Sequence, residues 1–225
     1  LAAKSWAPLY SGSLLETEIP SSPNPQADRP RMAATASDVD KMARTAMASY
    51  CLERSMDFPD PKEFRQAVGL LPTGVTVVSA FGAEGPAGAT ASAVCSLSLV
   101  PMMMLACLDR GSRSLAALEG ADRFGISVLS ERQRPAAEIF ATKSPQSEKW
   151  ATAEWSDHLG VPIVEHSLAH IVCGLKEVIP GGDHVIITGD VLEVEARPGE
   201  PLVYHGGIFR TLDAQRRGPG DEGPP

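Results

Sequence analysis

One stretch of the chain, residues 85–101, combines residue types that let a backbone approach a ligand closely. It reads GPAGATASAVCSLSLVP, and seven of the ten residues from Ala89 to Ser98 are Ala, Ser or Thr. Small side chains leave backbone N–H groups accessible, and hydroxyl groups add further hydrogen bonds. The residues alone leave two readings open, a ligand-binding strand or an ordinary Ser/Thr-rich edge strand after a Gly/Pro turn.

Other kinds of site chemistry lack their motifs in this chain. No G-x-G-x-x-G follows a predicted strand, and the chain has no Walker A loop and no G-x-S-x-G elbow. His166 and His170 have H-x3-H spacing, but their segment reads as a strand, where helical i, i+4 geometry is absent. No metal site is therefore predicted. Composition leaves a Ser/His/Asp triad open, but nothing marks one serine as an exposed, strained nucleophile.

Composition limits the kind of partner. The chain has 225 residues with a net charge of −8, and Arg216-Arg217 is its longest basic cluster, which argues against nucleic acid or an anionic membrane. Its longest apolar stretch, residues 97–108, is interrupted by Ser98 and Pro101 and is too short to span a membrane. The four cysteines form no C-x-x-C pair, and the first ten residues contain no apolar signal segment. These features predict a cytoplasmic protein.

Hydrophobic periods and turn residues predict the elements that must position the site. Residues 60–71 predict a helix with Asp60 as N-cap and Pro61 at its first position. Residues 74–80 predict a strand, and 82–88 a turn that leads back into the small-residue stretch. Further strands are predicted at 102–109, 124–129, 163–164, 169–180, 184–196, 201–204 and 208–212, and helices at 111–120 and 130–140. The polar segment 141–160 predicts a long loop or lid with helical turns.

About seven short strands without regular βα alternation exclude a doubly wound sheet. They predict a mostly β fold, a single antiparallel barrel with a few peripheral helices. Residues 58–212 would form this domain. Residues 1–57 predict a partly disordered N-terminal extension with a candidate helix at 38–53, and residues 213–225 a low-complexity tail.

Four motifs, in this order and spacing, resemble the flavin reductase family with the FMN-binding split-barrel fold. They are FRQAVGLLPTGVTVVSA (64–80), GATASAVCSLSLVP (88–101), GGDHVIITGDVLEVE (181–195) and PLVYHGGIF (201–209). The resemblance covers roughly residues 58–212. It implies an antiparallel split β-barrel and an NAD(P)H:flavin oxidoreductase, which transfers a hydride from NADH or NADPH to FAD or FMN.

The resemblance also implies which residues form the site. Those on the flavin side are Thr73, Gly74, Val75, Thr90, Ala91, Ser92, Cys95, Ser96 and Leu97, with Ser112, Arg113 and Ser114 around the phosphate. Those on the nicotinamide side are His184, His205, Gly206, Gly207 and Phe209, and His184 would orient the carboxamide. From the residues alone, Ser112 reads equally as a helix cap, Arg113 as a solvated charge and His184 as an exposed turn histidine.

Three positions depart from the common family pattern. Ser92 stands where Asn is frequent, Val94 where Phe is frequent, and Phe209 where Tyr is often seen. The first two departures leave the choice between FMN and FAD open, and the third removes a hydroxyl group that could serve the dinucleotide.

The family further implies a homodimer that supplies free reduced flavin by diffusion to a partner monooxygenase. Two alternatives are a flavin-retaining electron carrier or sensor of the same fold, and another split-barrel oxidase of the pyridoxamine-phosphate type. The Gly-Asp-His and Tyr-His-Gly motifs argue against the second alternative.

Overall fold

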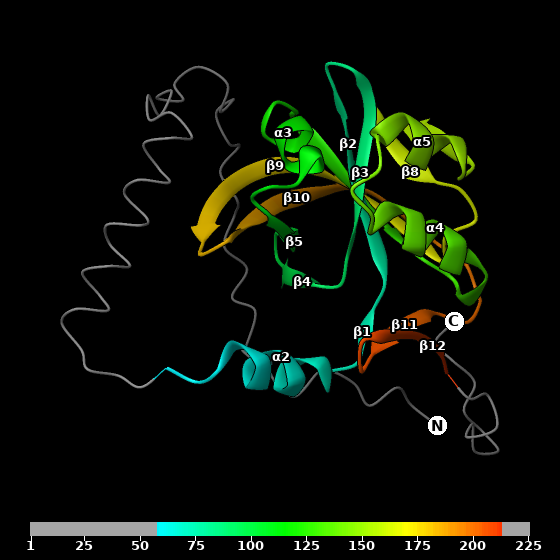
Figure 1. Cartoon of the computed structure of the whole chain (residues 1–225). Coiled ribbons are helices and arrows are strands. Elements are labelled where there is room, and N and C mark those ends of the chain that lie inside the picture. Colours follow the sequence, from blue (N-terminus) through cyan, green and yellow to red (C-terminus); the bar gives the residue numbers. More distant parts are fainter. Residues whose placement is uncertain (1–57, 213–225) are drawn as a thin grey trace, which may run out of the picture. The chain divides into compact units, whose positions relative to one another are not determined.

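A curled antiparallel sheet dominates residues 58–212, which are the part of the chain that the computed structural model describes (Figure 1). Its strand order is β3-β2-β6-β9-β10-β5-β4. These strands are β2 (Thr76–Gly82), β3 (Gly85–Ala91), β4 (Val94–Leu99), β5 (Met102–Asp109), β6 (Arg123–Val128), β9 (Ala169–Gly181) and β10 (His184–Ala196). Two smaller sheets contain β1 (Thr73–Gly74), β11 (Leu202–His205) and β12 (Ile208–Thr211), and β7 (Trp155–His158) with β8 (Val161–Val164).

The main sheet curls because its two edge strands are consecutive in the chain. Only Ser92 and Ala93 separate β3 from β4, and so short a link spans at most about 11 Å. At this link the Cys107 N–H of β5 donates a 2.8 Å hydrogen bond to the Ala93 carbonyl oxygen. The edges of the sheet therefore approach each other, which gives the predicted barrel.

The barrel interior is filled by apolar side chains from several strands of the main sheet. Val78 of β2, Phe124 of β6 and Ile187 of β10 are fully buried in one cluster. The helix α3 (Arg113–Glu119) adds Leu115 and Leu118 to the same cluster. These contacts hold the start of α3 beside β3 and β5.

A second apolar cluster covers the outer face of β2. Val77 and Leu129 pack there with Phe140 of α4 (Arg134–Phe140) and Trp150 of α5 (Gln146–Ala151). The Phe140 and Trp150 rings meet edge to face with centroids 4.8 Å apart. Because Phe140 and Trp150 are both buried, the segment between α4 and α5 is held close to β3.

Two glycines allow close packing within the barrel. A Cβ at Gly189 would lie 2.6 Å from the Phe124 ring and 2.7 Å from the Gly174 carbonyl oxygen. A Cβ at Gly125 would lie 2.6 Å from the Ile163 side chain. All three distances are too short for a real Cβ contact, so at Gly189 a larger residue would displace the Phe124 ring and the backbone of β9.

Most predicted elements are present. The helix α2 (Pro61–Gly69) begins after Asp60, whose Oδ1 accepts a 2.7 Å hydrogen bond from the Lys62 N–H. Strands β5, β6, β9, β10, β11 and β12 and helices α3 and α4 lie where the sequence predicts them, α4 following a short 3-10 turn, η2 (Glu131–Gln133). The predicted helix at 38–53 lies outside the described residues.

Three predictions about the strands are wrong. The structure has twelve strands within residues 58–212 rather than about seven, partly because residues 85–101 form two strands instead of one. The turn after β2 is only Ala83-Glu84, not residues 82–88. Residues Trp155–His158 form β7 instead of part of a loop, because pairing with β8 stabilises a segment whose own sequence shows no apolar alternation.

No helix within residues 58–212 is long and apolar enough to cross a membrane.

Candidate active site

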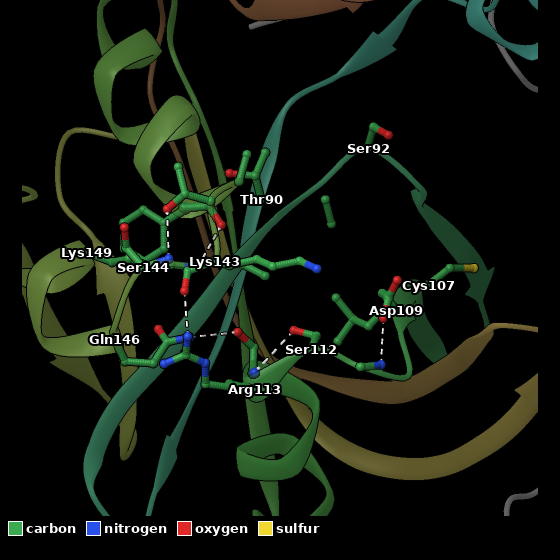
Figure 2. A pocket seen from close by; sticks show the side chains of 18 of the residues that line it. Thr90, Ser92, Cys107, Asp109, Ser112, Arg113, Lys143, Ser144, Gln146 and Lys149 are labelled. Atoms are coloured by element: carbon green, nitrogen blue, oxygen red, sulfur yellow. Dashed lines mark hydrogen bonds between the residues drawn. The ribbon is translucent and has the colours of Figure 1, made fainter. Parts of the chain in front are cut away.

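A cavity of about 460 Å³ lies between β3, the start of α3 and the segment that joins α4 to α5 (Figure 2). This volume is within the range of small-molecule sites. Its wall combines backbone of β3 and the β3–β4 link with hydroxyl and cationic side chains. The polar lining residues include Thr90, Ser92, Asp109, Ser112, Arg113, Ser114, Lys143, Gln146, Lys149 and His184.

Lys149 is the most unusual residue of this cavity, because it is a buried cation that has no counter-ion among the described residues. The residue is 4% exposed. Its Nζ donates a 3.1 Å hydrogen bond to the Phe140 carbonyl oxygen, and within residues 58–212 it forms no ion pair. Burial lowers the pKa of Lys149, and the nearby charge of Arg113 lowers it further. A bound anion would remove this electrostatic cost.

Two more cations lie around Lys149. Figure 2 shows the Lys143 side chain extending into the open space of the cavity. The Arg113 guanidinium donates a 2.5 Å hydrogen bond to the Lys143 carbonyl oxygen, which ties the first residue of α3 to the segment after α4. Arg113, Lys143 and Lys149 together give one end of the cavity a positive charge suited to a phosphate group.

Hydrogen bonds fix the wall between these cations. The Gly88 N–H of β3 donates to Gln146 Oε1 at 2.9 Å, and Gln146 Nε2 donates to Ser114 Oγ at 3.2 Å. Ser112 Oγ accepts from the Ser114 N–H at 3.2 Å and so acts as the N-cap of α3. Thr90 Oγ1 donates to the Ala137 carbonyl oxygen at 2.6 Å. Strand β3 and helices α3, α4 and α5 are therefore joined around one opening.

His184 lies at the opposite rim of the cavity. It begins β10 and pairs with Asp109 at the end of β5, and both residues line the cavity. His184 Nδ1 lies 2.8 Å from Asp183 Oδ1, and this hydrogen bond lowers the pKa of the Asp183 carboxyl group. Because an ionised carboxylate only accepts, Nδ1 is the donor, which leaves Nε2 available to a ligand.

A second cavity, of about 430 Å³, shares Thr90, Ser92 and Ala141 with the first. Its other lining residues are Val75, Arg134, Glu138, Tyr204, Gly207, Ile208 and Phe209. The Tyr204 and Phe209 rings meet edge to face with centroids 5.3 Å apart. Gly207, at the β11–β12 turn, has a φ of 81°, a conformation that glycine adopts without strain. The two cavities together give a site with a cationic end and an aromatic end.

The structure thus brings most of the predicted site residues to these two cavities, but divides them differently from the predicted grouping. Thr90, Ala91, Ser92, Ser112, Arg113, Ser114 and His184 line the first cavity, and Val75, Thr90, Ser92, Gly207 and Phe209 line the second. Thr73, Gly74, Cys95, Ser96, Leu97, His205 and Gly206 line neither. Thr73 Oγ1 is nevertheless buried and has no hydrogen-bond partner within the described residues.

Sequence reasoning missed several polar residues of the first cavity, and three of these, Lys143, Gln146 and Lys149, lie close together in the sequence. They belong to the segment TKSPQSEKW, which was expected to form a polar loop or lid. Because polar residues make up this segment up to Trp150, its sequence does not indicate that Lys149 is buried. Only the packing of Phe140 against Trp150 places that lysine beside β3.

The split barrel and its cationic, backbone-lined cavity agree with the flavin-binding oxidoreductase that the four motifs predict. Residues 68–213 match the family described as "Flavin reductase like domain". The chain belongs to this family, as its four motifs predict.

Named relatives and solved structures agree with this family. The chain is 35% identical over 164 residues to the flavin-dependent monooxygenase reductase subunit HsaB of Mycobacterium tuberculosis, covering 71% of this chain and 87% of the relative. It is also 35% identical over 161 residues to an NADH-dependent FAD reductase of Streptomyces globisporus, covering 68% and 88%. The structure of the NADH:FAD oxidoreductase SgcE6 of Streptomyces globisporus C-1027 with NAD and FAD fragments matches with a TM-score of 0.66 and 32% identity, over 72% of this chain and 100% of that one. The predicted split-barrel fold and flavin reductase class are confirmed.

The residues present fit a flavin nucleotide. Such a ligand needs a cationic place for its phosphate, hydrogen-bonding groups along its ribityl chain and space for a planar ring. Arg113, Lys143 and Lys149 meet the first need, and Thr90 and Ser112 supply hydroxyl groups beside them. The buried Lys149, which has no counter-ion in the part of the chain that the structure describes, is the strongest indication of an anionic ligand.

Proposed function

We propose that this chain is an NADH-dependent flavin reductase that binds FMN or FAD in the first cavity and supplies reduced flavin to a separate monooxygenase. The main evidence for the binding site is the burial of Lys149, a cation without a carboxylate partner within residues 58–212. It lies in one cavity with Arg113 and Lys143. This arrangement favours a phosphate ester over a neutral or cationic ligand.

The flavin phosphate lies in this proposal between Arg113, Lys143 and Lys149, with Ser112 and Ser114 beside it. The Gln146 side chain bonds both Gly88 and Ser114, so it holds this end of the cavity at a fixed width. The ring then extends past Thr90 and Ser92, the two polar residues that both cavities share. Backbone N–H groups of the small-residue link from Ala91 to Ala93 are its hydrogen-bond donors.

In this proposal the second cavity would hold the nicotinamide beside the flavin ring. Gly207 and Phe209 line that cavity. His184 lines the first cavity, and its Nε2 would hydrogen-bond the carboxamide of the nicotinamide. A bound flavin accepts a hydride from a reduced nicotinamide. The chain therefore needs only to bind and orient two rings, and no side chain has to act as a nucleophile.

We propose that reduced flavin is delivered by diffusion, which the open cavity supports. Several relatives are named as reductase components, including that of a 4-nitrophenol 4-monooxygenase of Rhodococcus opacus. We therefore propose a monooxygenase as the partner. We also propose the cytoplasm as the chain's location, which the free thiols of Cys95, Cys107 and Cys173 support.

A homodimer is the proposed assembly. Helix α2 has no buried residue. Phe64 and Val68, which lie four residues apart on one face of the helix, are 61% and 42% exposed, and Leu71, just after the helix, is 66% exposed. A second copy of the chain would cover this face. Light scattering should give a dimer for the wild type and a monomer for Phe64→Glu; a monomeric wild type would contradict the assembly.

Steady-state oxidation of NADH and NADPH with FMN, FAD and riboflavin tests the proposed activity. We expect NADH to be oxidised at a rate that saturates with the concentration of FMN or FAD. After gel filtration the protein should be largely free of flavin. A protein that retains yellow flavin and does not turn over added flavin would instead be an electron carrier.

A further inference from the structure

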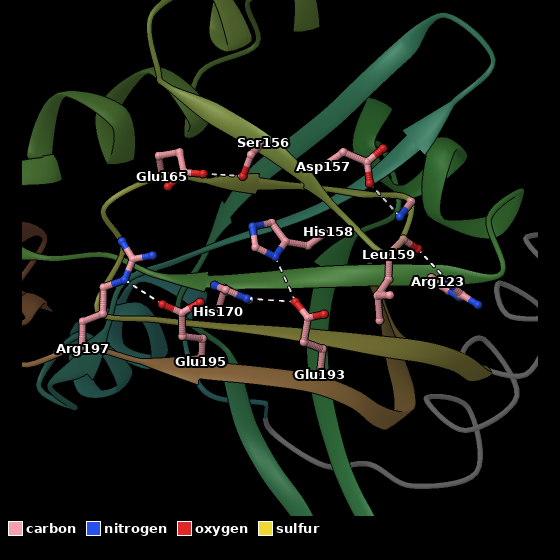
Figure 3. A network of polar contacts seen from close by, with 11 residues as sticks. Arg123, Ser156, Asp157, His158, Leu159, Glu165, His170, Glu193, Glu195 and Arg197 are labelled. Atoms are coloured by element: carbon pink, nitrogen blue, oxygen red, sulfur yellow. Dashed lines mark hydrogen bonds and ion pairs between the residues drawn. The ribbon is translucent and has the colours of Figure 1, made fainter.

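Three side chains from three strands converge on one point outside both cavities (Figure 3). His158 ends β7, His170 lies on β9, and Glu193 lies on β10. His158 Nδ1 is 2.9 Å and His170 Nε2 is 3.1 Å from the same atom, Glu193 Oε1. The two imidazole rings have centroids 4.3 Å apart. Two imidazoles and one carboxylate therefore face a common centre.

The backbone explains why these residues meet. Glu193 pairs with Val172, two residues from His170, so His170 and Glu193 point to the same face of the sheet as diagonal neighbours. A bulge between Val191 and Glu193 sets this register. His158 is brought over that face by the β7–β8 hairpin, which packs on β2 and β6 through Ile163.

The hairpin turn itself is tightly fixed. Leu159 and Gly160 both have positive φ angles, 52° and 78°, as in a two-residue type I′ turn. The Arg123 guanidinium donates a 2.7 Å hydrogen bond to the Leu159 carbonyl oxygen. The position of His158 at the start of this turn is therefore determined by contacts to β6, and not by the cluster alone.

We propose that His158, His170 and Glu193 bind one divalent transition-metal ion, for which Zn²⁺ is the best match. The three ligand atoms lie within 4.8 Å of one another. A tetrahedral zinc ion with bonds of 2.0–2.1 Å needs its ligand atoms about 3.3 Å apart. The two N···O distances of 2.9 and 3.1 Å need to open by only a few tenths of an ångström. Water would complete the fourth position.

The ligand set selects the class of metal. Imidazole nitrogen favours zinc and its neighbours in the first transition series, whereas Mg²⁺ and Ca²⁺ require mainly oxygen ligands. His170 is 8% and His158 27% exposed at the side chain, so a metal would be partly shielded and still accessible. It would link the β7–β8 hairpin to the main sheet. His166, the other histidine of the H-x3-H spacing, is not part of this cluster and contacts Glu154 at 3.1 Å.

Equilibrium dialysis of the full chain against Zn²⁺, after removal of metals by a chelator, tests the site. We expect one zinc ion per wild-type chain at this site and binding weakened by about a hundredfold in His158→Ala. Glu193→Gln, which keeps the size of the side chain, should have a comparable effect. His166→Ala is the matched control, since it removes an exposed imidazole of the same segment, and it should bind zinc like the wild type. Mg²⁺ should not compete.

Co²⁺ provides a second readout, because its visible absorption reports tetrahedral coordination. The spectrum should be intense in the wild type and in His166→Ala, and absent in His158→Ala and Glu193→Gln. Circular dichroism of each variant shows whether it is folded, and if His158→Ala does not fold, Glu193→Gln carries the test. Equal zinc affinity in all four proteins, or no binding by the wild type, would leave the cluster as a hydrogen-bond network only and overturn the proposal.

Discussion

Replacement of Lys149 by methionine separates ligand binding from folding at the candidate active site. Lys149 is buried, its Nζ bonds only one carbonyl oxygen among the described residues, and its pKa is lowered by burial. Methionine retains the length of the side chain and removes the charge. Because an unpaired buried ammonium group is unfavourable, we expect Lys149→Met to unfold without flavin at the same temperature as the wild type or at a higher one.

Flavin binding should change in the opposite direction. A hydrogen bond to a charged group contributes about 2 kcal/mol net, which corresponds to about a thirtyfold change in affinity. The Kd of FMN should therefore rise by about thirtyfold if Lys149 contacts its phosphate. Riboflavin lacks the phosphate, and its Kd should change little.

Fluorescence titration with FMN and riboflavin measures these dissociation constants, and steady-state NADH oxidation gives the KM values. Lys176→Met is the matched control, because Lys176 is an exposed lysine whose Nζ lies 3.2 Å from Asp190 on the β9–β10 surface. It should leave both flavin affinities unchanged. An unchanged Kd for FMN in Lys149→Met would refute the assigned cavity. An equal rise for FMN and riboflavin would refute the phosphate contact.

Three further predictions concern other parts of the domain. His184→Ala should raise the KM for NADH more than that for flavin in steady-state assays, and equal effects would contradict its nicotinamide role. Gly189→Ala should lower the free energy of unfolding by about 2 kcal/mol, because its Cβ would lie 2.9 Å from the Cβ of Cys173. Gly69→Ala, at a helical position with open space, is its control in denaturant titration and should not destabilise. A thiol reagent at pH 8 should modify exposed Cys95 in the native protein and spare Cys173, whose pKa burial raises to about 12; mass spectrometry showing equal labelling would contradict this.

The sequence alone predicts the fold and family because their signals are local and ordered along the chain. The Asp60-Pro61 start of α2, the β-branched run of β2 and the turn before His184 each follow from a few neighbouring residues. The small-residue stretch from Ala89 to Ser98 indicates a backbone-lined site for the same reason. Its order relative to the Gly-Asp-His and Tyr-His-Gly motifs then identifies the family.

Tertiary structure decides the electrostatics of the active site and the histidine cluster. Lys149 stands in a polar segment, and only the packing of Phe140 and Trp150 against the barrel buries it beside Arg113. His158 and Glu193 are 35 residues apart in the sequence, and strand register with one bulge brings them together. Burial and long-range pairing depend on contacts between distant segments, so no local sequence pattern predicts them. The flavin reductase family is therefore visible in the sequence, whereas its anion site and the proposed metal site are visible only in the folded chain.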